Sequence, residues 1–373
     1  MSSSVSPLFQ PLRLGAVNVQ HRVVMAPLTR FRANKSHVHG ELAKTYYDQR
    51  ASVPGTLIIS EATIVAPQAG GYGNAPGIWN DAQIAGWKPV TDAVHARGSS
   101  IFLQLWALGR VANPTVLKTE GNFDVVAPSP IPLASDRESV VPRELTVPEI
   151  KDYVQLYAKA ARNAIEAGFD GVEVHGANGY LLDQFLQSVS NERTDEYGGS
   201  IENRLRFPLE VIDAVVKAVS AERTAVRISP WSKFQDMGME DPLTTFTPFV
   251  ERIRDAHPNL AYIHVIEDLE RTSGTNPNDD NSTDSSNSLR KIWGGRPYIA
   301  AGGFDRASAN NTVEKHGGLI AFGRDFISNP DLPLRLKEGI ALTRYNRDTF
   351  YLPETPVGYV DYPFANEVTP LKA

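Results

Sequence analysis

The chain has 373 residues, of which 42% are hydrophobic and 21% charged, and a chain of this size and composition can bury the core of a globular protein. Its net charge of −6 and its lack of basic runs argue against a nucleic-acid partner, and the absence of cysteine excludes disulfides, zinc–thiolate sites, iron–sulfur clusters and a catalytic thiol. The first residues lack the form of a secretory signal, and no apolar run approaches the ~20 residues of a membrane span. We therefore expect a cytoplasmic protein with no membrane partner.

Eight short apolar runs, separated by helical patterns, follow one another along the chain. Near-continuous apolar runs of this length are typical of parallel strands that are buried on both faces. The predicted strands are residues 22–27, 56–61, 100–105, 171–176, 225–230, 262–267, 297–302 and 319–324. Residues 12–21, which precede them, resemble a hairpin that closes the bottom of a barrel.

Two of the intervals between strands carry distinct helix signals. Thr146 and Glu149 form a capping box, and Gly168 ends the helix that follows it. Its predicted apolar face is Ile150, Tyr153, Val154, Tyr157, Ala161, Ala164 and Ile165. Ser200 caps the second helix, whose predicted inward residues are Ile201, Leu205, Leu209, Ile212 and Val216.

Eight β–α alternations predict a (β/α)8 barrel, an α/β fold that typically needs ~250 residues. The surplus residues lie where a barrel permits extended loops on its C-terminal face. They are an insertion at 107–145, a polar and acidic segment at 268–288 that is either a lid or disordered, and a tail beyond residue 340. No linker divides the chain, so we expect residues 1–373 to form one domain with a C-terminal tail.

Barrel enzymes build their active sites from residues at the C-terminal ends of the strands. In this chain those positions hold mostly uncharged hydrogen-bonding groups and one cation: Thr29, Gln104, His175, Asn178 and Arg227, accompanied by Trp106 and Tyr180. This set favours a flat heterocycle with polar edges over a metal, because hard cations need several carboxylates and zinc needs three good ligands. Only Glu61 and Glu267 are acidic strand ends, and no second histidine is positioned to partner His175.

The last two strands end in glycines and an arginine. Gly302 and Gly303 follow the seventh strand, and Gly323 and Arg324 follow the eighth. Bare backbone N–H groups beside a guanidinium can hold a phosphate, although the glycines alone could simply turn the chain. No Walker loop is present and "GGYGNAPG" is only superficially like a dinucleotide fingerprint, so a bound mononucleotide fits better than a dinucleotide.

The segments "APLTRFRA", "QLWALGR", "GFDGVEVHGANGYLLDQFLQSVSNERTDEYGGSIENRLRF", "VRISP" and "FGRDFISNPDL" occur in order. With them the chain resembles the Old Yellow Enzyme family from about Leu8 to the tail. The resemblance implies a (β/α)8 barrel that binds FMN non-covalently. It also implies an NADPH dehydrogenase, or ene-reductase, which reduces the C=C bond of α,β-unsaturated carbonyl compounds with NADPH, NADH being the alternative reductant.

The resemblance also implies residue roles at the cofactor. Thr29 would hydrogen-bond the flavin carbonyl near N5, and Arg227 would stabilise negative charge on the pyrimidine side of the reduced ring. Pro27, Leu28, Ala62 and Gln104 would complete the ring edge. Gly302, Gly303, Gly323 and Arg324 would hold the phosphate, and Phe350 and Tyr351 would pack beside the flavin.

His175 and Asn178 look like the pair that holds a substrate carbonyl or phenolate oxygen. Two donors that converge on one oxygen stabilise the enolate that develops when hydride from flavin N5 reaches the β-carbon. Tyr180 looks like the acid that protonates the α-carbon, since a phenol with a pKa near ~10 keeps its proton at neutral pH. As isolated residues, His175 could instead be a satisfied core histidine and Tyr180 a packing aromatic. Trp106 either shapes the substrate pocket or is an ordinary core tryptophan.

The chain departs from the family pattern at Gly303, where several relatives carry asparagine, and in the acidic segment, where no lid residue can be assigned. Thr29, in a chain without cysteine, indicates the classical branch, and Tyr180 favours net reduction over alkene isomerisation. The competing functions are a flavin-dependent isomerase or dehydrogenase, a phenol- or steroid-binding flavoprotein without significant turnover, and a metal-dependent hydrolase. The expected partners are a small enone or enal substrate and phenolic inhibitors, with the protein a monomer or homodimer.

Overall fold

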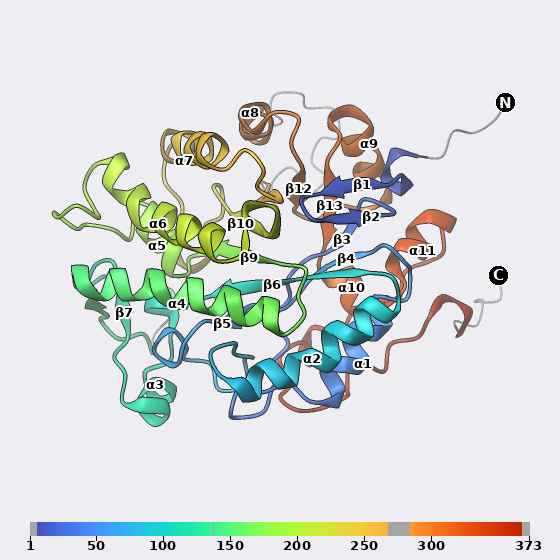
Figure 1. Ribbon diagram of the computed structural model, residues 1–373, viewed down its shortest axis with the longest axis horizontal. Coiled ribbons are helices and arrows are strands. Elements are labelled where there is room, and N and C mark those ends of the chain that lie inside the picture. The colour runs from blue at the N-terminus through green and yellow to red at the C-terminus, as the bar shows by residue number, and fades with distance from the viewer. Residues whose placement is uncertain (1–5, 137, 268–283, 368–373) are drawn as a thin grey trace.

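A computed structural model of the chain describes residues 6–136, 138–267 and 284–367. Eight parallel strands form a closed barrel at the centre of the molecule, and helices surround it (Figure 1). The strands are β3 (Val23–Met25), β4 (Leu57–Ile59), β6 (Ser100–Trp106), β9 (Gly171–Gly176), β10 (Thr224–Ile228), β11 (Tyr262–Ile266), β12 (Tyr298–Ala301) and β13 (Leu319–Phe322). Each pairs with the next in chain order, β13 pairs with β3, and the short β5 (Thr63–Ile64) lies beside β6. All eight predicted strands and the (β/α)8 barrel are confirmed.

The interior of the barrel is apolar in the half nearest the N-terminal ends of the strands. Phe102, Ala225 and Tyr262 pack there with aliphatic residues of the other strands. The hairpin of β1 (Leu12–Leu14) and β2 (Val17–Val19) closes this end, and the Ala16 N–H donates to the Glu222 carbonyl at 3.0 Å. The predicted hairpin is therefore confirmed, and its apolar side chains join the same buried cluster.

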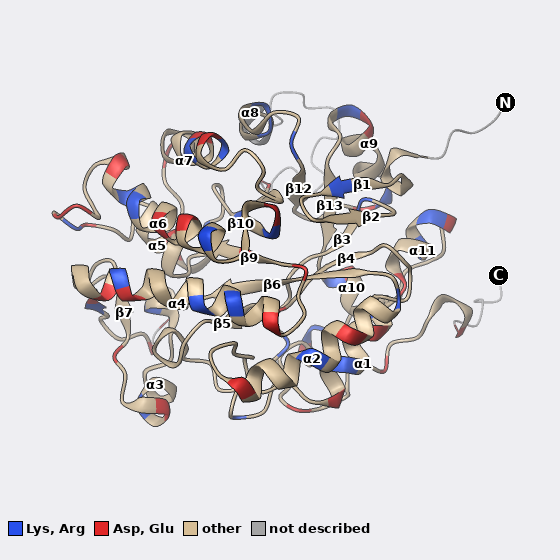
Figure 2. Cartoon of the chain, in the orientation of Figure 1, with Lys and Arg blue, Asp and Glu red and all other residues tan. Residues whose placement is uncertain are grey.

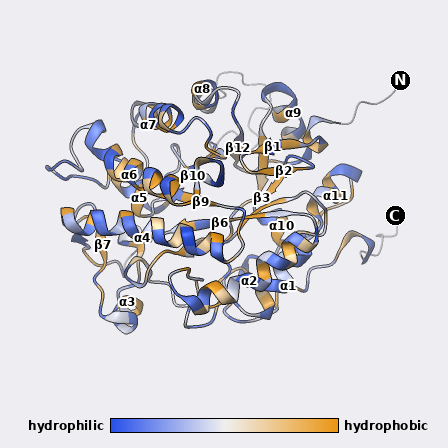
Figure 3. Cartoon of the chain, in the orientation of Figure 1, coloured by the Kyte–Doolittle hydropathy of each residue, from blue (hydrophilic) through white to orange (hydrophobic). Residues whose placement is uncertain are grey.

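Helices follow the strands and cover the outside of the barrel. They are α1 (Glu41–Arg50), α2 (Asp81–Ala96), α4 (Val147–Glu166), α5 (Leu181–Leu186), α6 (Ile201–Val219), α7 (Leu243–Ala256), α8 (Asp284–Trp293), α9 (Arg306–His316), α10 (Arg324–Ser328) and α11 (Leu332–Glu338). Figure 3 shows hydrophobic colour on the barrel strands and on one side of helices such as α4 and α6. Within the described residues, no helix has both the length and the apolar character that a bilayer crossing requires.

The predicted capping box of α4 is present, because the Glu149 N–H donates to the Thr146 hydroxyl and the Thr146 N–H donates to the Glu149 carboxylate. Its predicted apolar face is buried except for Ile165, which is half-buried. Helix α6 is also capped by Ser200, as predicted.

The predicted inward face of α6 is partly wrong. Ile201, Leu209 and Val216 are only half-buried, whereas the fully buried stripe includes Phe207, Val211 and Val215. The helix packs on both the barrel and its neighbours, so its buried stripe is wider than the predicted set, which lies along one edge of it.

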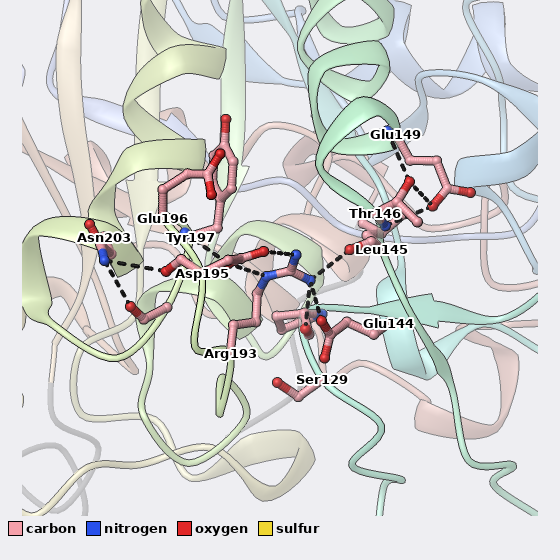
Figure 4. A network of polar contacts seen from close by, with 12 residues as sticks. Ser129, Glu144, Leu145, Thr146, Glu149, Arg193, Asp195, Glu196, Tyr197 and Asn203 are labelled. Carbon is pink, nitrogen blue, oxygen red and sulfur yellow. Dashed lines mark hydrogen bonds and ion pairs between the residues drawn. The ribbon is translucent and has the colours of Figure 1, made fainter.

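The insertion at 107–145 contains the 3-10 turn η3 (Gly109–Val111), helix α3 (Pro114–Gly121) and strands β7 (Val126–Ala127) and β8 (Arg143–Glu144). Figure 4 shows how the buried Arg193, which follows α5, ties this insertion down. Its guanidinium donates to the carbonyls of Leu145 at 2.7 Å and Pro128 at 3.0 Å, and it pairs with Asp195 and Glu144. Arg193 therefore anchors the second half of the insertion at Pro128, Glu144 and Leu145.

The predicted acidic segment lies mostly at residues 268–283, which are outside the described residues. Its last residues begin α8. The prediction of a lid or a disordered loop therefore stays a prediction.

The C-terminal tail is bound by arginines from the start of the chain. Arg32 donates to the carbonyls of Thr349, Phe350, Thr355 and Val357, at 2.9 to 3.1 Å. Two further buried arginines, Arg30 and Arg50, reach the carbonyls of Gly358 at 2.7 Å and Tyr359 at 3.1 Å. Figure 2 shows charges of both signs spread over helices such as α2 and α4. Arg30, Arg32 and Arg50 are instead buried, and we call these three arginines the clamp on the tail.

Candidate functional site

A cavity of about 950 Å³ opens at the C-terminal ends of the barrel strands. A second cavity of about 280 Å³ adjoins it, and the two share Pro27, Leu28, Arg227 and Arg324 as lining residues. The larger cavity alone is within the size range of small-molecule sites, ~300–1,000 Å³, and we call the two adjoining cavities the trough. The other predicted site residues in the larger cavity are Thr29, Ala62, Gln104, Trp106, His175, Asn178, Tyr180, Phe350 and Tyr351. The smaller cavity adds Gly302, Gly303 and Gly323.

His175 lies near the end of β9, paired in register with Arg227 of β10. It is 3% exposed, and its Nδ1 has no hydrogen-bond partner within the described residues. Burial and the neighbouring Arg227 cation hold the pKa of His175 well below its ordinary value. The imidazole is therefore neutral at physiological pH.

The turn after His175 has two consecutive left-handed residues, Asn178 (φ 58°) and Gly179 (φ 72°). Asparagine tolerates this conformation better than most side chains, and glycine adopts it without strain. The Asn178 N–H donates to the Ser229 hydroxyl at 2.7 Å, which fixes the turn against β10. The turn therefore directs both Asn178 and the following Tyr180 to the cavity that they line.

Tyr180 packs among aromatic rings at the cavity wall. Its ring centroid lies 4.9 Å from that of Trp106, at an interplanar angle of 89°, and 5.1 Å from that of His175. Burial raises the pKa of the Tyr180 phenol, so it carries its proton throughout the physiological range. Trp106 is 1% exposed and also lines the cavity, so the two interpretations of Trp106, core residue and pocket wall, both apply.

The floor of the trough holds a polar layer that rests on the apolar interior of the barrel. The Gln104 amide donates to the Glu173 carboxylate at 2.8 Å, and His264 Nδ1 lies 2.9 Å from the other Glu173 oxygen. Arg227 is 8% exposed and its Nε has no partner in the described part of the chain. Unpaired buried donors of this kind fit a ligand with polar edges.

Glu173 and His264 were not predicted as site residues, because they lie inside β9 and β11 and not at the strand ends. Glu173 precedes His175 by two residues, so strand periodicity places both on the same face. His264 is a second histidine in this region, but Arg227 stands in register between it and His175. Among the described residues, however, no group of three or more His, Asp or Glu side chains could hold a metal ion.

The smaller cavity has the features of an anion site. Gly302 (φ 137°) and Gly303 (φ 69°) adopt conformations that side chains disfavour, and a Cβ on Gly302 would lie 3.2 Å from the Glu267 carbonyl oxygen. Arg324 is exposed, and its guanidinium donates to the Tyr345 hydroxyl at 3.2 Å. Backbone N–H groups of such glycines and a nearby guanidinium are groups that can hold a phosphate.

Several cavity residues were not predicted. Phe31, Tyr72 and Phe234 extend the aromatic wall, and Phe234 is 61% exposed at the cavity mouth. Gln235 and the next residue, both with φ 58°, form a strained turn that the Arg110 guanidinium holds at 3.0 Å from the Gln235 carbonyl. Apart from the aromatic content of "KFQD", the sequence gives no local signal for this turn.

Comparisons with known proteins agree with this geometry. The model of the NADH:flavin oxidoreductase / NADH oxidase family matches residues 7–343. Chanoclavine-I aldehyde reductase fgaOx3 of Penicillium roqueforti (strain FM164) is 50% identical, covering 97% of this chain and 98% of its own length. A probable inactive dehydrogenase, easA of Claviceps fusiformis, is 47% identical, covering 98% and 96%. The solved structure of the old yellow enzyme homologue from Zymomonas mobilis (NCR) matches with a TM-score of 0.86 and 39% identity, covering 95% of this chain and 99% of that one.

Proposed function

The chain belongs to the NADH:flavin oxidoreductase / NADH oxidase family, within its Old Yellow Enzyme members, and from this premise we propose that it is an ene-reductase of α,β-unsaturated carbonyl compounds. The observation that carries the proposal is the meeting of His175, Asn178 and Tyr180 in one cavity with Gln104 and Arg227. The first three suit a carbonyl substrate, and the last two suit the edge of a flavin.

FMN is the cofactor that the family name and the trough support. Gln104 and Arg227 would face the pyrimidine end of the ring and Thr29 its N5 side, with Pro27, Leu28 and Ala62 along the edge and Phe350 and Tyr351 beside it. Gly302, Gly303, Gly323 and Arg324 would hold the phosphate. When bound, FMN would take hydride from NADPH or NADH and supply it to the β-carbon of the alkene.

His175 and Asn178 would bind the carbonyl oxygen of the substrate. A neutral imidazole N–H and an amide N–H can both donate to one oxygen, and their hydrogen bonds strengthen as negative charge develops there. The depressed pKa of His175 serves this role, because a neutral ring donates without losing its proton to the enolate.

Tyr180 would protonate the α-carbon. Its raised pKa keeps the phenol protonated before the reaction, and its position against Trp106 fixes the hydroxyl in the cavity wall. Positioned general acids of this kind typically contribute ~10²–10⁴-fold in rate. Without this proton, an enolate would return to the starting alkene or its isomer.

A second candidate function is ligand binding without turnover. The relative named as a probable inactive dehydrogenase is the reason to consider it. The same donor pair would then capture phenols or steroids and no reaction would follow. The presence of Tyr180 favours the reductase.

The test is the visible spectrum of purified protein under anaerobic conditions, first with NADPH or NADH and then with cyclohexenone. We expect a flavin spectrum that bleaches with reductant and returns with the enone. Tyr180→Phe should still bleach and still bind phenols, but reoxidation by the enone should slow by ~10²-fold or more. Normal reoxidation in Tyr180→Phe would contradict the role of this residue, and bleaching of wild-type protein without recovery would favour the binding protein.

A further inference from the structure

Beneath the trough lies a buried carboxylate that the proposed reaction does not use. The Glu173 side chain is fully buried in the barrel interior and does not line either cavity. It stands in register with Gln104 on the neighbouring strand β6. Burying a carboxylate is costly unless it is paired, so its partners indicate what it does.

The hydrogen bonds of Glu173 fix the direction in which Gln104 points. Burial alone would raise the pKa of Glu173, but His264, Arg227 and the Gln104 amide together hold it below its ordinary value, so the carboxylate is ionised. An ionised carboxylate only accepts hydrogen bonds. The Gln104 NH2 must therefore face Glu173, at 2.8 Å, which leaves the Gln104 carbonyl oxygen as the acceptor for the cavity.

Glu173 also balances the charge of the floor. The pKa of His264 lies below its ordinary value because of burial, so its ring is neutral and donates from Nδ1 to Glu173 at 2.9 Å. The remaining charge nearby is the buried Arg227 guanidinium, whose attraction to Glu173 offsets part of the cost of burying both. Because Glu173 offsets part of the positive charge of Arg227, a negative charge on a ligand above Arg227 would be stabilised less than it would be without Glu173.

We propose that Glu173 is a positioning residue for the cofactor: it holds the Gln104 carbonyl toward the trough and offsets part of the positive charge of Arg227. This inference rests on the proposed function, since it concerns how the trough receives a flavin. Glu173 touches neither substrate nor cofactor and acts through Gln104 and Arg227.

Two substitutions separate the two effects. Glu173→Asp keeps the charge but shortens the side chain, so the contact with Gln104 should be lost. Glu173→Gln keeps the length and can still accept from Gln104 through its carbonyl oxygen, but removes the charge. The first should weaken FMN binding, and the second should raise the midpoint potential of the flavin, because uncompensated Arg227 favours the more negative reduced ring.

FMN affinity is measured by equilibrium dialysis of the full chain in a double-mutant cycle of Glu173→Asp with Gln104→Ala. Glu173→Asp alone should weaken FMN binding about three- to tenfold, the loss of one hydrogen bond, and should have little further effect once Gln104 is alanine. Glu61→Asp is the matched control, since Glu61 is equally buried and lies 3.4 Å from His39. Its effect should be the same with and without the Gln104 substitution.

The midpoint potentials of wild type, Glu173→Gln and Glu173→Asp are measured by dye titration. We expect a rise for Glu173→Gln and a value near wild type for Glu173→Asp. A wild-type potential in Glu173→Gln, or additive effects in the affinity cycle, would overturn the positioning role. If Glu173→Gln does not fold, the cycle with Glu173→Asp decides alone. Wild-type protein that takes up no FMN would overturn the proposed function itself, and this inference with it.

Discussion

The clamp on the C-terminal tail allows a worked prediction for Arg32→Lys. The Arg32 guanidinium donates to four tail carbonyls, and its Cζ lies 4.9 Å from the centroid of the Tyr359 ring. A lysine keeps the charge but presents its donors from one point, so it cannot reach all four carbonyls. Loss of two hydrogen bonds to a charged donor, at ~1.5–3 kcal/mol each, would destabilise the bound tail by about 3–6 kcal/mol.

The assay is amide hydrogen exchange of the tail, followed by mass spectrometry. A loss of ~3 kcal/mol corresponds to about 100-fold faster exchange for amides in residues 349–360 that exchange by opening of the tail. The barrel strands should be unchanged, and FMN affinity should fall because the tail carries Phe350 into the cavity. Arg344→Lys, an exposed position in the same tail, is the matched control and should have no effect. Tail exchange in Arg32→Lys at the wild-type rate would refute the clamp.

Three further predictions follow from the site. Gly179→Ala should lower the free energy of unfolding in urea by about 2–5 kcal/mol, because its Cβ would lie 2.8 Å from Met237 at φ 72°. Gly199 is also left-handed but has its nearest neighbour at 3.7 Å, so Gly199→Ala should cost only the ~1–2 kcal/mol of backbone strain. Equal costs for the two substitutions would contradict the packing argument. The buried Asp183 of α5 accepts from the Gly179 N–H at 2.8 Å. Burial raises the pKa of Asp183 to about 6, so its contribution to stability is present at low pH and should fall by about 3 kcal/mol between pH 4 and 7. Asp183→Asn should lose this part of the pH dependence of the free energy of unfolding. Equal slopes of that free energy against pH in the variant and the wild type would refute the role of Asp183. Arg324→Ala should weaken FMN binding about tenfold or more without changing riboflavin affinity, whereas unchanged FMN affinity would contradict a phosphate site at Arg324.

The barrel could be predicted from sequence because its strands are buried on both faces. Runs such as "TLIIS" and "LIAFG" therefore read as near-continuous apolar segments, and their number and spacing led directly to the fold. The buried face of α6 was harder to predict. A helix that packs on several neighbours has a wide apolar stripe, and a simple spacing rule assigns too few residues to it.

The clamp was not predictable in the same way. Arg30 and Arg32 lie in the segment "APLTRFRA", but their partners are backbone carbonyls, and Arg30 binds that of Phe350 across 320 residues. Every residue has a backbone carbonyl, so an arginine that binds backbone carbonyls has no recognisable partner in the sequence. Contacts of this kind become visible only in three dimensions.

The polar floor shows the same limit and also explains the position of the site. Three neighbouring strands place His175, Arg227 and His264 in register, and Glu173 accepts from His264 Nδ1 at 2.9 Å. Of these groups only Glu173 and Arg227 carry charge, because burial keeps both imidazoles neutral. The floor therefore holds two opposite charges that attract each other, while His175 and Tyr180, which line the cavity, remain neutral. Such an arrangement can bind an oxygen that becomes negative and can also give up a proton, whereas a charged imidazolium would lose its proton to the same oxygen. The placement of charge on Arg227 and Glu173, beside neutral reacting groups, is thus as much a part of the site as the residues that line it.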